Sequence, residues 1–388
     1  MFAQFDRFKL PKVIKSTPIT TMNQRNNLEN SMLPSDNRIN TQVLAQIFNN
    51  TVATYKYYWF LSLLDQVVLH KKKEISFWEI IIGMIADAWY PIHYFRLSFG
   101  NADSLYDQIK LLQTELNIPV DANKTEIKAL LSNHLDSPRI ISHLRVFSYN
   151  VPYRFLSPWI TFTYNADVVR RSVAFENQCI YGITGDSIKI NPDWMEYLQN
   201  NYQILRDFTF WNLATFLQKR NPNVPDILSK LVKPIFRDSL LKQRHYWDTF
   251  IDIHGPIKCI YTGKELVRQS YDLDHFLPWS FVAHNLIWNL IPSDSCINSS
   301  KSNNIPALEK YLKPYVRLHQ EAFHTLYEKN RNYVILEDFL SLHNSLSDIY
   351  RFNEDKFYEI FKNTLSPMAQ FAENRGFKFW IGPSNACL

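Results

Sequence analysis

The segment SYDLDHFLPWSF, residues 270–281, has the most distinctive pattern in this chain of 388 residues. Its side chains alternate up to His275 as they do in a β-strand, which places Asp272 and Asp274 on one face and His275 on the other. Pro278 ends the strand because proline cannot donate a hydrogen bond to a neighbouring strand. The segment therefore predicts a short strand that carries two carboxylates and an imidazole close together.

Two further segments flank this strand and differ in pattern from the rest of the chain. The first, KCIYTGKEL at 258–266, predicts a short strand that enters a glycine turn. The second, NLIWNLIPSDSCINSSKSNN at 285–304, predicts a loop around Asn289 and then a short helix. On that helix Asn298 and Lys301 lie three positions apart, on one face. The three segments together predict a small module of two strands and a helix.

These residue types suit the hydrolysis of a phosphodiester bond. A neutral histidine such as His275 can take a proton from water near pH 7. A hard cation such as Mg²⁺ prefers oxygen ligands and keeps several waters, so the carboxylate of Asp274 and the amide carbonyl of Asn298 suffice to hold it. Asn289 can fix the carbonyl and the ring of the histidine through backbone hydrogen bonds. The pattern thus favours a metal-dependent hydrolase.

The order Asp-His, Asn, Asn resembles the HNH (ββα-metal) endonuclease family over residues 254–310, and is similar to the HNH domain of RNA-guided CRISPR nucleases. This resemblance implies His275 as general base, Asp274 and Asn298 as ligands of Mg²⁺ or Mn²⁺, Asn289 as the orienting residue, Lys301 as a phosphate or structural contact, and Asp272 as an auxiliary acidic group. Many HNH proteins bind zinc through two cysteine pairs, but only Cys259 occupies such a neighbourhood here. Surrounding helices must therefore brace the module.

The rest of the chain predicts an α+β protein with helices on both sides of this module. Few glycines (8) against many aromatic residues (10 Trp, 21 Tyr and 27 Phe) indicate a dense, helix-rich body. The expected regions are a polar leader at 1–40, a mainly helical N-terminal domain with a small β element at 41–245, the ββα-metal module at 246–310, and a helical C-terminal segment at 311–388 that packs on it.

Local patterns predict the elements of the N-terminal domain and of the C-terminus. We expect one continuous helix from about 41 to 69, a second over 76–90 that ends at Pro91, two or three short helices within 103–136, a β-rich stretch at 151–164, a hairpin over 179–190, helices over 191–217 and 228–250, and a terminal strand at 376–380. The loop NPNVP at 221–225 separates the last two helices.

Charge and cysteine usage limit the expected binding partners and the expected cellular compartment. The net charge is +5, and residues 230–317 hold 12 Lys or Arg against 8 Asp or Glu, which suits a phosphate-binding face. The segment before the module offers Arg237, Lys242 and Arg244 as phosphate contacts. DNA is the expected partner, RNA stays open, and a homodimer would allow both strands to be cut. Four scattered cysteines and no signal-peptide or membrane pattern predict a soluble, cytoplasmic protein.

Three functional readings follow. The preferred one is a DNA endonuclease of restriction or phage defence, since a small nuclease module joined to an unfamiliar large domain suits that role. A homing or mobile-element nuclease is the nearest alternative. The third is a nucleic-acid-binding or regulatory protein that keeps the HNH fold without catalysis.

Overall fold

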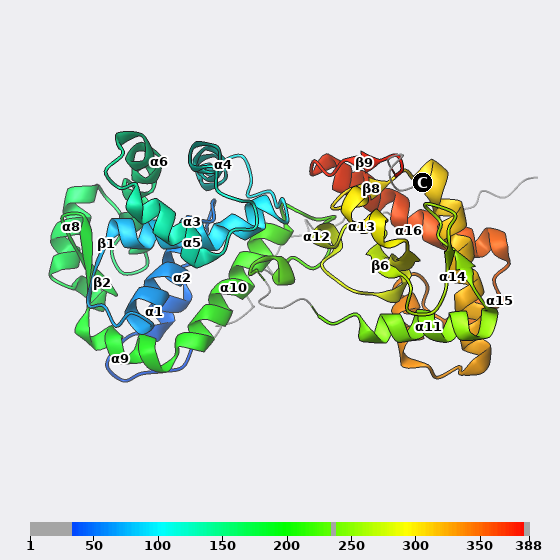
Figure 1. Ribbon diagram of the computed structural model, residues 1–388. Coiled ribbons are helices and arrows are strands. Elements are labelled where there is room, and N and C mark those ends of the chain that lie inside the picture. The colour runs from blue at the N-terminus through cyan, green and yellow to red at the C-terminus, as the bar shows by residue number, and fades with distance from the viewer. Residues whose placement is uncertain (1–32, 234–237, 384–388) are drawn as a thin grey trace, which may run out of the picture.

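Two apolar helices, α2 (Tyr55–Val68) and α3 (Phe77–His93), form the centre of the N-terminal part of the chain. They pack against each other, and almost every side chain of both is buried. Ser76 begins α3 through reciprocal hydrogen bonds with Glu79. A helix that is apolar on all sides has to be surrounded. The computed structural model, which describes residues 33–233 and 238–383, shows how this is achieved (Figure 1).

Shorter helices and one small sheet surround this pair. The helices are α1 (Thr41–Ala45), α4 (Ser104–Leu116), α5 (Lys124–Asn133), α6 (Pro138–Ser148), α7 (Val151–Phe155), α8 (Asn165–Val173), α9 (Pro192–Asn200) and α10 (Tyr202–Gln218), with 3₁₀ turns η1 (Glu176–Gln178) and η2 (Leu228–Lys230). The sheet joins β1 (Glu74–Ser76), β3 (Ser187–Ile190) and β2 (Tyr181–Thr184), all antiparallel. The predicted hairpin is confirmed, with Gly185 at φ +60° in its turn.

The second lobe contains the predicted module and the C-terminal helices. Its elements are α11 (Leu241–His254), β4 (Ile257–Lys258), β5 (Glu265–Leu266), β6 (Asp272–His275), α12 (Trp279–Val282), η3 (Ile287–Asn289), β7 (Leu290–Ser293), α13 (Ser295–Lys301), β8 (Ile305–Pro306), α14 (Leu308–Lys329), η4 (Val334–Ser341), α15 (Leu346–Arg351), α16 (Glu354–Asn374) and β9 (Phe379–Trp380). The predicted terminal strand is confirmed: β9 pairs in parallel with β8. In Figure 1, α12 lies between the two lobes.

Aromatic and cationic contacts join the lobes. The rings of Tyr94 and Phe95 pack against Trp279 of α12, with centroid distances of 6.3 and 5.8 Å. Arg96 places its guanidinium 4.3 Å from the centroid of Phe377, beyond the end of α16. Residues 94–96, directly after α3, are thus one part of the N-terminal lobe that contacts the second lobe.

Two predictions about the first helices are wrong. The expected continuous helix is broken between α1 and α2, where Asn50 has φ +59° and the Thr51 hydroxyl donates to the carbonyl of Phe48. Such local side-chain bonds compete with helix formation. The second helix does not end at Pro91 but continues to His93, because a proline in the last turn removes only one helical hydrogen bond.

Two further predictions fail for reasons connected with proline. Residues 151–155 form α7 and not a strand, since Pro152 suits the first turn of a helix and outweighs the aromatic residues around it. The helix expected over 228–250 is only the 3₁₀ turn η2, followed by α11 from Leu241. Pro234 disfavours helical backbone in the residue before it, and 231–233 are non-helical. Within the described residues, no helix has the length and apolarity needed to cross a bilayer.

Candidate active site

The predicted strand, strand and helix arrangement is present around His275. β6 pairs antiparallel with β7, with His275 opposite Leu290 and Asp274 opposite Ile291. α13 follows β7 directly and packs on β6. This places the end of α13, with Lys301, against the two residues of β6 that carry the predicted chemistry.

The imidazole of His275 is oriented by a residue that the sequence did not single out. Its Nε2 lies 2.9 Å from Oδ1 of Asn285, and the backbone carbonyl of Asn285 accepts a hydrogen bond of 2.8 Å from Gln243 of α11. An amide oxygen only accepts, so Nε2 carries the proton in this contact and Nδ1 is the basic nitrogen. The arrangement suits a general base that acts through Nδ1.

Asp274 has two hydrogen-bond donors in a buried environment. Its Oδ1 lies 3.1 Å from Nζ of Lys301, and its Oδ2 accepts a hydrogen bond of 2.8 Å from the Tyr261 hydroxyl. The side chains of Lys301 and Asp274 are 1% and 5% exposed. Burial, followed by the negative charge of Asp274, raises the pKa of Tyr261 well above its usual value, so the phenol stays a donor. The carboxylate is therefore fixed in position by one charged and one neutral partner.

Lys301 and Asn289 both bond the backbone around His275. The prediction assigned the His275 carbonyl to Asn289, and the structure has a different partner there. The carbonyl of His275 accepts a 2.6 Å hydrogen bond from Lys301 and not from Asn289. Asn289 is fully buried and bonds Leu277 in both directions, with Oδ1 accepting from its N–H (2.9 Å) and Nδ2 donating to its carbonyl (3.0 Å). Asn289 thus fixes the chain two residues beyond the histidine.

The comparisons with known proteins agree with this geometry. A family model described as HNH endonuclease matches residues 259–307. A stretch of 76 residues is 36% identical to the CRISPR-associated endonuclease Cas9 of Listeria innocua. The stretch is 19% of this chain and only 5% of that protein. This chain contains an HNH module. No solved structure matches the chain.

Aromatic and polar contacts from the surrounding helices brace the HNH module, as expected for one that lacks cysteine pairs. The ring of Phe276 stacks on Tyr315 of α14 at 3.9 Å, and the Tyr315 hydroxyl donates to the carbonyl of Trp288. Trp247 of α11 donates to the carbonyl of Leu290 in β7 at 3.2 Å. Cys259 is buried, and its sulfur accepts a hydrogen bond from the Asp294 N–H at 3.4 Å.

The remaining predicted site residues have varied positions. Asp272 is partly buried at the start of β6. Asn298 belongs to α13, but its side chain lies outside the described residues, as does the whole of Arg237. Lys242 is exposed on α11. Arg244 donates to the carbonyl of Tyr271 at 3.0 Å and lies over its ring, so its guanidinium contributes to the fold.

A cleft of about 450 Å³ opens in front of His275, between the two lobes. The HNH module contributes Asp274, His275, Asn285, Trp279, Asn303 and neighbouring residues, the segment before α11 contributes Asp238 and Leu240, and the N-terminal lobe contributes Tyr94. Apart from the imidazole, the polar lining consists of carboxylate, amide and hydroxyl groups, the oxygen-rich set that a hard cation prefers. Among the described residues no three His, Cys, Asp or Glu gather as a metal-binding group.

A second histidine, His284, lies close to His275 and differs from it in its environment. Burial, followed by the nearby His275, lowers the pKa of His284 to about 4, so this ring is neutral at pH 7. Its Nδ1 accepts from the Leu286 N–H at 3.3 Å. This contact is structural, since it holds the backbone two residues further along the chain.

Sequence reasoning missed Asn285, Tyr261 and Gln243. Asn285 is ten positions after His275, and Tyr261 lies in the entry segment before β6. Each reaches the site only through the packing of β4, β5 and α11 around the HNH module. A signal was present only for Tyr261, a tyrosine two positions after Cys259 in a segment already assigned to this module.

Proposed function

We propose that this protein is a metal-dependent endonuclease that hydrolyses phosphodiester bonds of DNA in its HNH module. The observation that carries the proposal is the imidazole of His275, oriented by Asn285 and adjacent to the buried carboxylate of Asp274 at one cleft. A histidine and a carboxylate side by side supply a base for water and an oxygen ligand for a cation.

In this proposal each residue of the chain has a distinct task. His275 takes a proton from the attacking water at Nδ1 while Asn285 holds Nε2–H. Lys301 bonds both the Asp274 carboxylate and the His275 carbonyl, so it keeps the acid and the base in a fixed relation. Asn289 anchors Leu277 and limits movement of the loop after the histidine. These are positioning roles for Lys301 and Asn289.

The donor set fits Mg²⁺ or Mn²⁺. Asp274 and Asn298 would hold the ion, with Asp272 as an auxiliary acid, because each oxygen of Asp274 keeps a lone pair beside its present donor. When bound, such an ion stabilises negative charge on the phosphate and on the leaving oxygen. It keeps most of its waters, so two protein ligands are enough.

The N-terminal lobe would govern which nucleic acid reaches the HNH module. Tyr94 lines the cleft together with Trp279, so a strand entering the cleft meets aromatic rings from both lobes. Bases of single strands stack on such rings without sequence preference. Lys242, exposed on α11, and Arg237 would add phosphate contacts. Restriction or phage defence is the proposed context, and a pair of modules in a homodimer would cut both strands.

The decisive test is the nicking of supercoiled plasmid with Mg²⁺ or Mn²⁺, with EDTA as the metal-free control. We expect His275→Ala to lower the rate by at least about 100-fold, the usual contribution of a general base. His70→Ala is the matched control, because His70 is exposed in a turn of the N-terminal lobe. Its rate should equal that of the wild type.

Other outcomes separate the alternatives. Cleavage that survives His275→Ala would overturn the assignment of the base. Cleavage of RNA but not of DNA under the same conditions would replace the substrate. A wild-type protein that binds DNA yet cleaves no nucleic acid with either metal would favour the non-catalytic reading. Mapping of cuts to one long, repeated site would favour a homing nuclease over a defence nuclease.

A further inference from the structure

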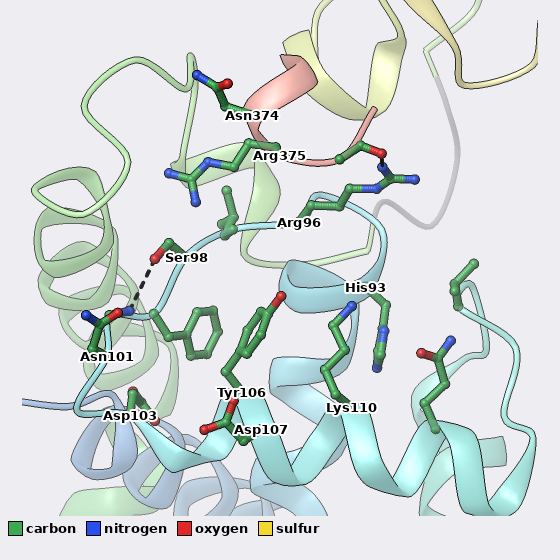
Figure 2. Close-up of a pocket in the computed structure, with 16 residues that line it drawn as sticks. His93, Arg96, Ser98, Asn101, Asp103, Tyr106, Asp107, Lys110, Asn374 and Arg375 are labelled. Carbon is green, nitrogen blue, oxygen red and sulfur yellow. Dashed lines mark hydrogen bonds between the residues drawn. The ribbon is translucent and has the colours of Figure 1, made fainter. Parts of the chain in front are cut away.

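A second cavity, here called the basic pocket, lies between the lobes and apart from the nuclease residues. Its volume is about 690 Å³, and Figure 2 shows its lining. The segment after α3 contributes His93 and Arg96, helix α4 contributes Tyr106 and Lys110, and the end of α16 contributes Arg375. Three cations from three separate parts of the chain therefore face one cavity.

No carboxylate neutralises these three cations within the parts of the chain that the structure describes, 33–233 and 238–383. Arg96 donates to the carbonyl of Gly376, and Arg375 donates to that of Arg220 at 3.3 Å. Lys110 lies only over the ring of Tyr106, at 5.5 Å. Burial, followed by the charge of Arg96, lowers the pKa of Lys110. Like charges gathered without a counter-ion indicate a site for an anion.

His93 adds a buried ring nitrogen that has no hydrogen-bond partner among the described residues. The residue is 6% exposed, its ring packs on Trp89 at 4.3 Å, and its Nε2 has no hydrogen-bond partner in the described structure. Burial, followed by the charge of Lys110, lowers the pKa of His93 to about 4, so the ring is neutral at pH 7. Buried polar atoms are nearly always bonded, and this unpaired one belongs to a residue that lines the cavity.

The acidic residues of the basic pocket lie at its other end. Figure 2 shows Asp103 on the far side of Tyr106 from Lys110 and Arg96, and Asp107 below Tyr106 on the same helix. Asp103 is buried and accepts hydrogen bonds from the N–H groups of Thr54 (2.7 Å) and Leu105 (3.1 Å). Its charge is thus engaged at the start of α4, and the cationic end is separate.

We propose that the cationic end of the basic pocket binds a phosphate group, carried by a free nucleotide or by a nucleic-acid backbone. Arginine and lysine are the usual phosphate ligands, and a neutral imidazole can donate a further hydrogen bond. A cavity of about 690 Å³ also has the size of small-molecule sites in proteins.

The basic pocket and the cleft in front of His275 are lined by neighbouring residues of the chain. Tyr94 lines the cleft, whereas His93 and Arg96 line the basic pocket. Arg96 has φ +54°, a backbone conformation that turns the chain sharply at this point. A phosphate held by His93 and Arg96 therefore binds beside the residue that closes the cleft from the N-terminal lobe.

The test is calorimetric titration of the full chain in EDTA, with ATP as one probe and a 12-nucleotide single-stranded DNA as the other. A His275→Ala background removes cleavage, so the result does not depend on nuclease activity. We expect Lys110→Met to weaken binding by about tenfold, the effect of one charge-assisted hydrogen bond. Lys189→Met is the matched control, because Lys189 is exposed on β3 and removes the same charge.

The two probes distinguish the sources of the phosphate. Lys110-dependent binding of ATP alone identifies a free nucleotide, and such binding of the oligonucleotide alone identifies a nucleic-acid backbone; either supports the site. His93→Phe keeps a ring on Trp89 and removes Nε2, and should weaken the same probe several-fold, which guards against a folding defect in one variant. Equal affinities of wild type, Lys110→Met and His93→Phe for both probes would overturn the proposal, whatever the nicking assay shows.

Discussion

The cleft in front of His275 and the basic pocket are lined by neighbouring residues, Tyr94 and Arg96, and they differ in whether their lysine has a carboxylate partner. Behind the lining of the cleft, Lys301 is 1% exposed and lies 3.1 Å from the carboxylate of Asp274, which does line the cleft. In the basic pocket, Lys110 is partly buried and forms no ion pair with any carboxylate of the described chain. Lys110 lines its cavity, whereas Lys301 lies behind a residue that lines the other one, and of the two only Lys301 has a carboxylate partner among the described residues.

This difference in ion pairing indicates whether each cavity is held in shape by the chain itself or by a bound ligand. A buried pair such as Lys301 and Asp274 fixes geometry, because removing either partner leaves a charge without solvent or counter-ion. An unpaired cluster costs stability and persists where a ligand completes it. The cleft is therefore preorganised by the chain itself, whereas the basic pocket would be completed by an anion.

The largest expected effect is that of breaking the internal pair. Lys301→Met should lower the free energy of unfolding by roughly 3 kcal/mol, since it strands the buried carboxylate of Asp274. Urea unfolding in EDTA measures this change. Lys258→Met, at an exposed position of β4, is the matched control and should change stability by less than about 0.5 kcal/mol.

A metal should then rescue this variant selectively. Mn²⁺ at Asp274 replaces the lost positive charge, so it should raise the midpoint of unfolding of Lys301→Met more than that of the wild type. An equal shift in both proteins would mean that the cation does not bind at Asp274. A variant as stable as the wild type in EDTA would show that the pair contributes no net stability.

Buried histidines make the stability of the two lobes depend on pH. His319 is fully buried among Trp247, Tyr315 and Phe361, and burial lowers its pKa from 6.5 to about 3. Because the folded pKa lies below the unfolded value, its contribution is complete above pH 6.5 and is lost as the pH falls toward 3. The loss should reach about 2 kcal/mol at pH 5.

The variant His319→Phe isolates this contribution. It keeps a ring in the aromatic cluster and removes the titrating group, so the stability difference between pH 8 and pH 5 should shrink by that amount. His93→Phe should reduce the same difference in the N-terminal lobe, since the pKa of His93 is lowered to about 4. An unchanged pH dependence in His319→Phe would contradict a neutral, buried His319.

Orientation of the base should have a smaller effect, on catalysis and not on folding. Asn285→Ala removes the acceptor at Nε2 of His275 and should lower the rate of nicking by about tenfold. Asn285→Asp keeps an acceptor oxygen at that position and should retain most of the rate. The pH–rate profile is the further readout: it should shift in both variants, because each changes the partner of the base. Equal rates in Asn285→Ala and the wild type would contradict the orienting role.

The sequence identified the residues that meet around β6 and β7 better than the side chains that support them. Asp274, His275 and Asn289 are named by a local pattern of two strands and a loop, which depends on spacing alone. The partners Asn285 and Tyr261 reach these residues through tertiary packing, so spacing could not select them. Lys301 was read as a phosphate or structural contact, and the structure shows it bonded to Asp274 and His275. Its role in the reaction stays a prediction.

Helices were predicted well where a cap or a strong apolar pattern defines them, as at Ser76 and Asn191. They were predicted poorly near prolines, because a proline can either begin a helix or interrupt one. Pro152 begins a helix, and Pro91 lies within the last turn of one. A single sequence does not tell which of these effects a given proline has, because the effect depends on the residues that pack against that turn. The basic pocket was invisible for the same reason, since Arg96, Lys110 and Arg375 are far apart in the chain.

The smallest expected effect is the change in the free energy of unfolding caused by Lys110→Met. It should have the opposite sign to the change caused by Lys301→Met. Lys110→Met removes a charge that repels Arg96 and has no carboxylate partner, so the ligand-free protein should gain about 0.5 kcal/mol of stability. Urea unfolding in EDTA, with phosphate-free buffer, measures it beside Lys301→Met. Opposite signs for the two lysine variants would confirm that the cleft is completed by the chain and the basic pocket is not. A loss of more than about 1 kcal/mol in Lys110→Met would mean that Lys110 contributes to folding, and the two cavities would then differ less than their ion pairs indicate.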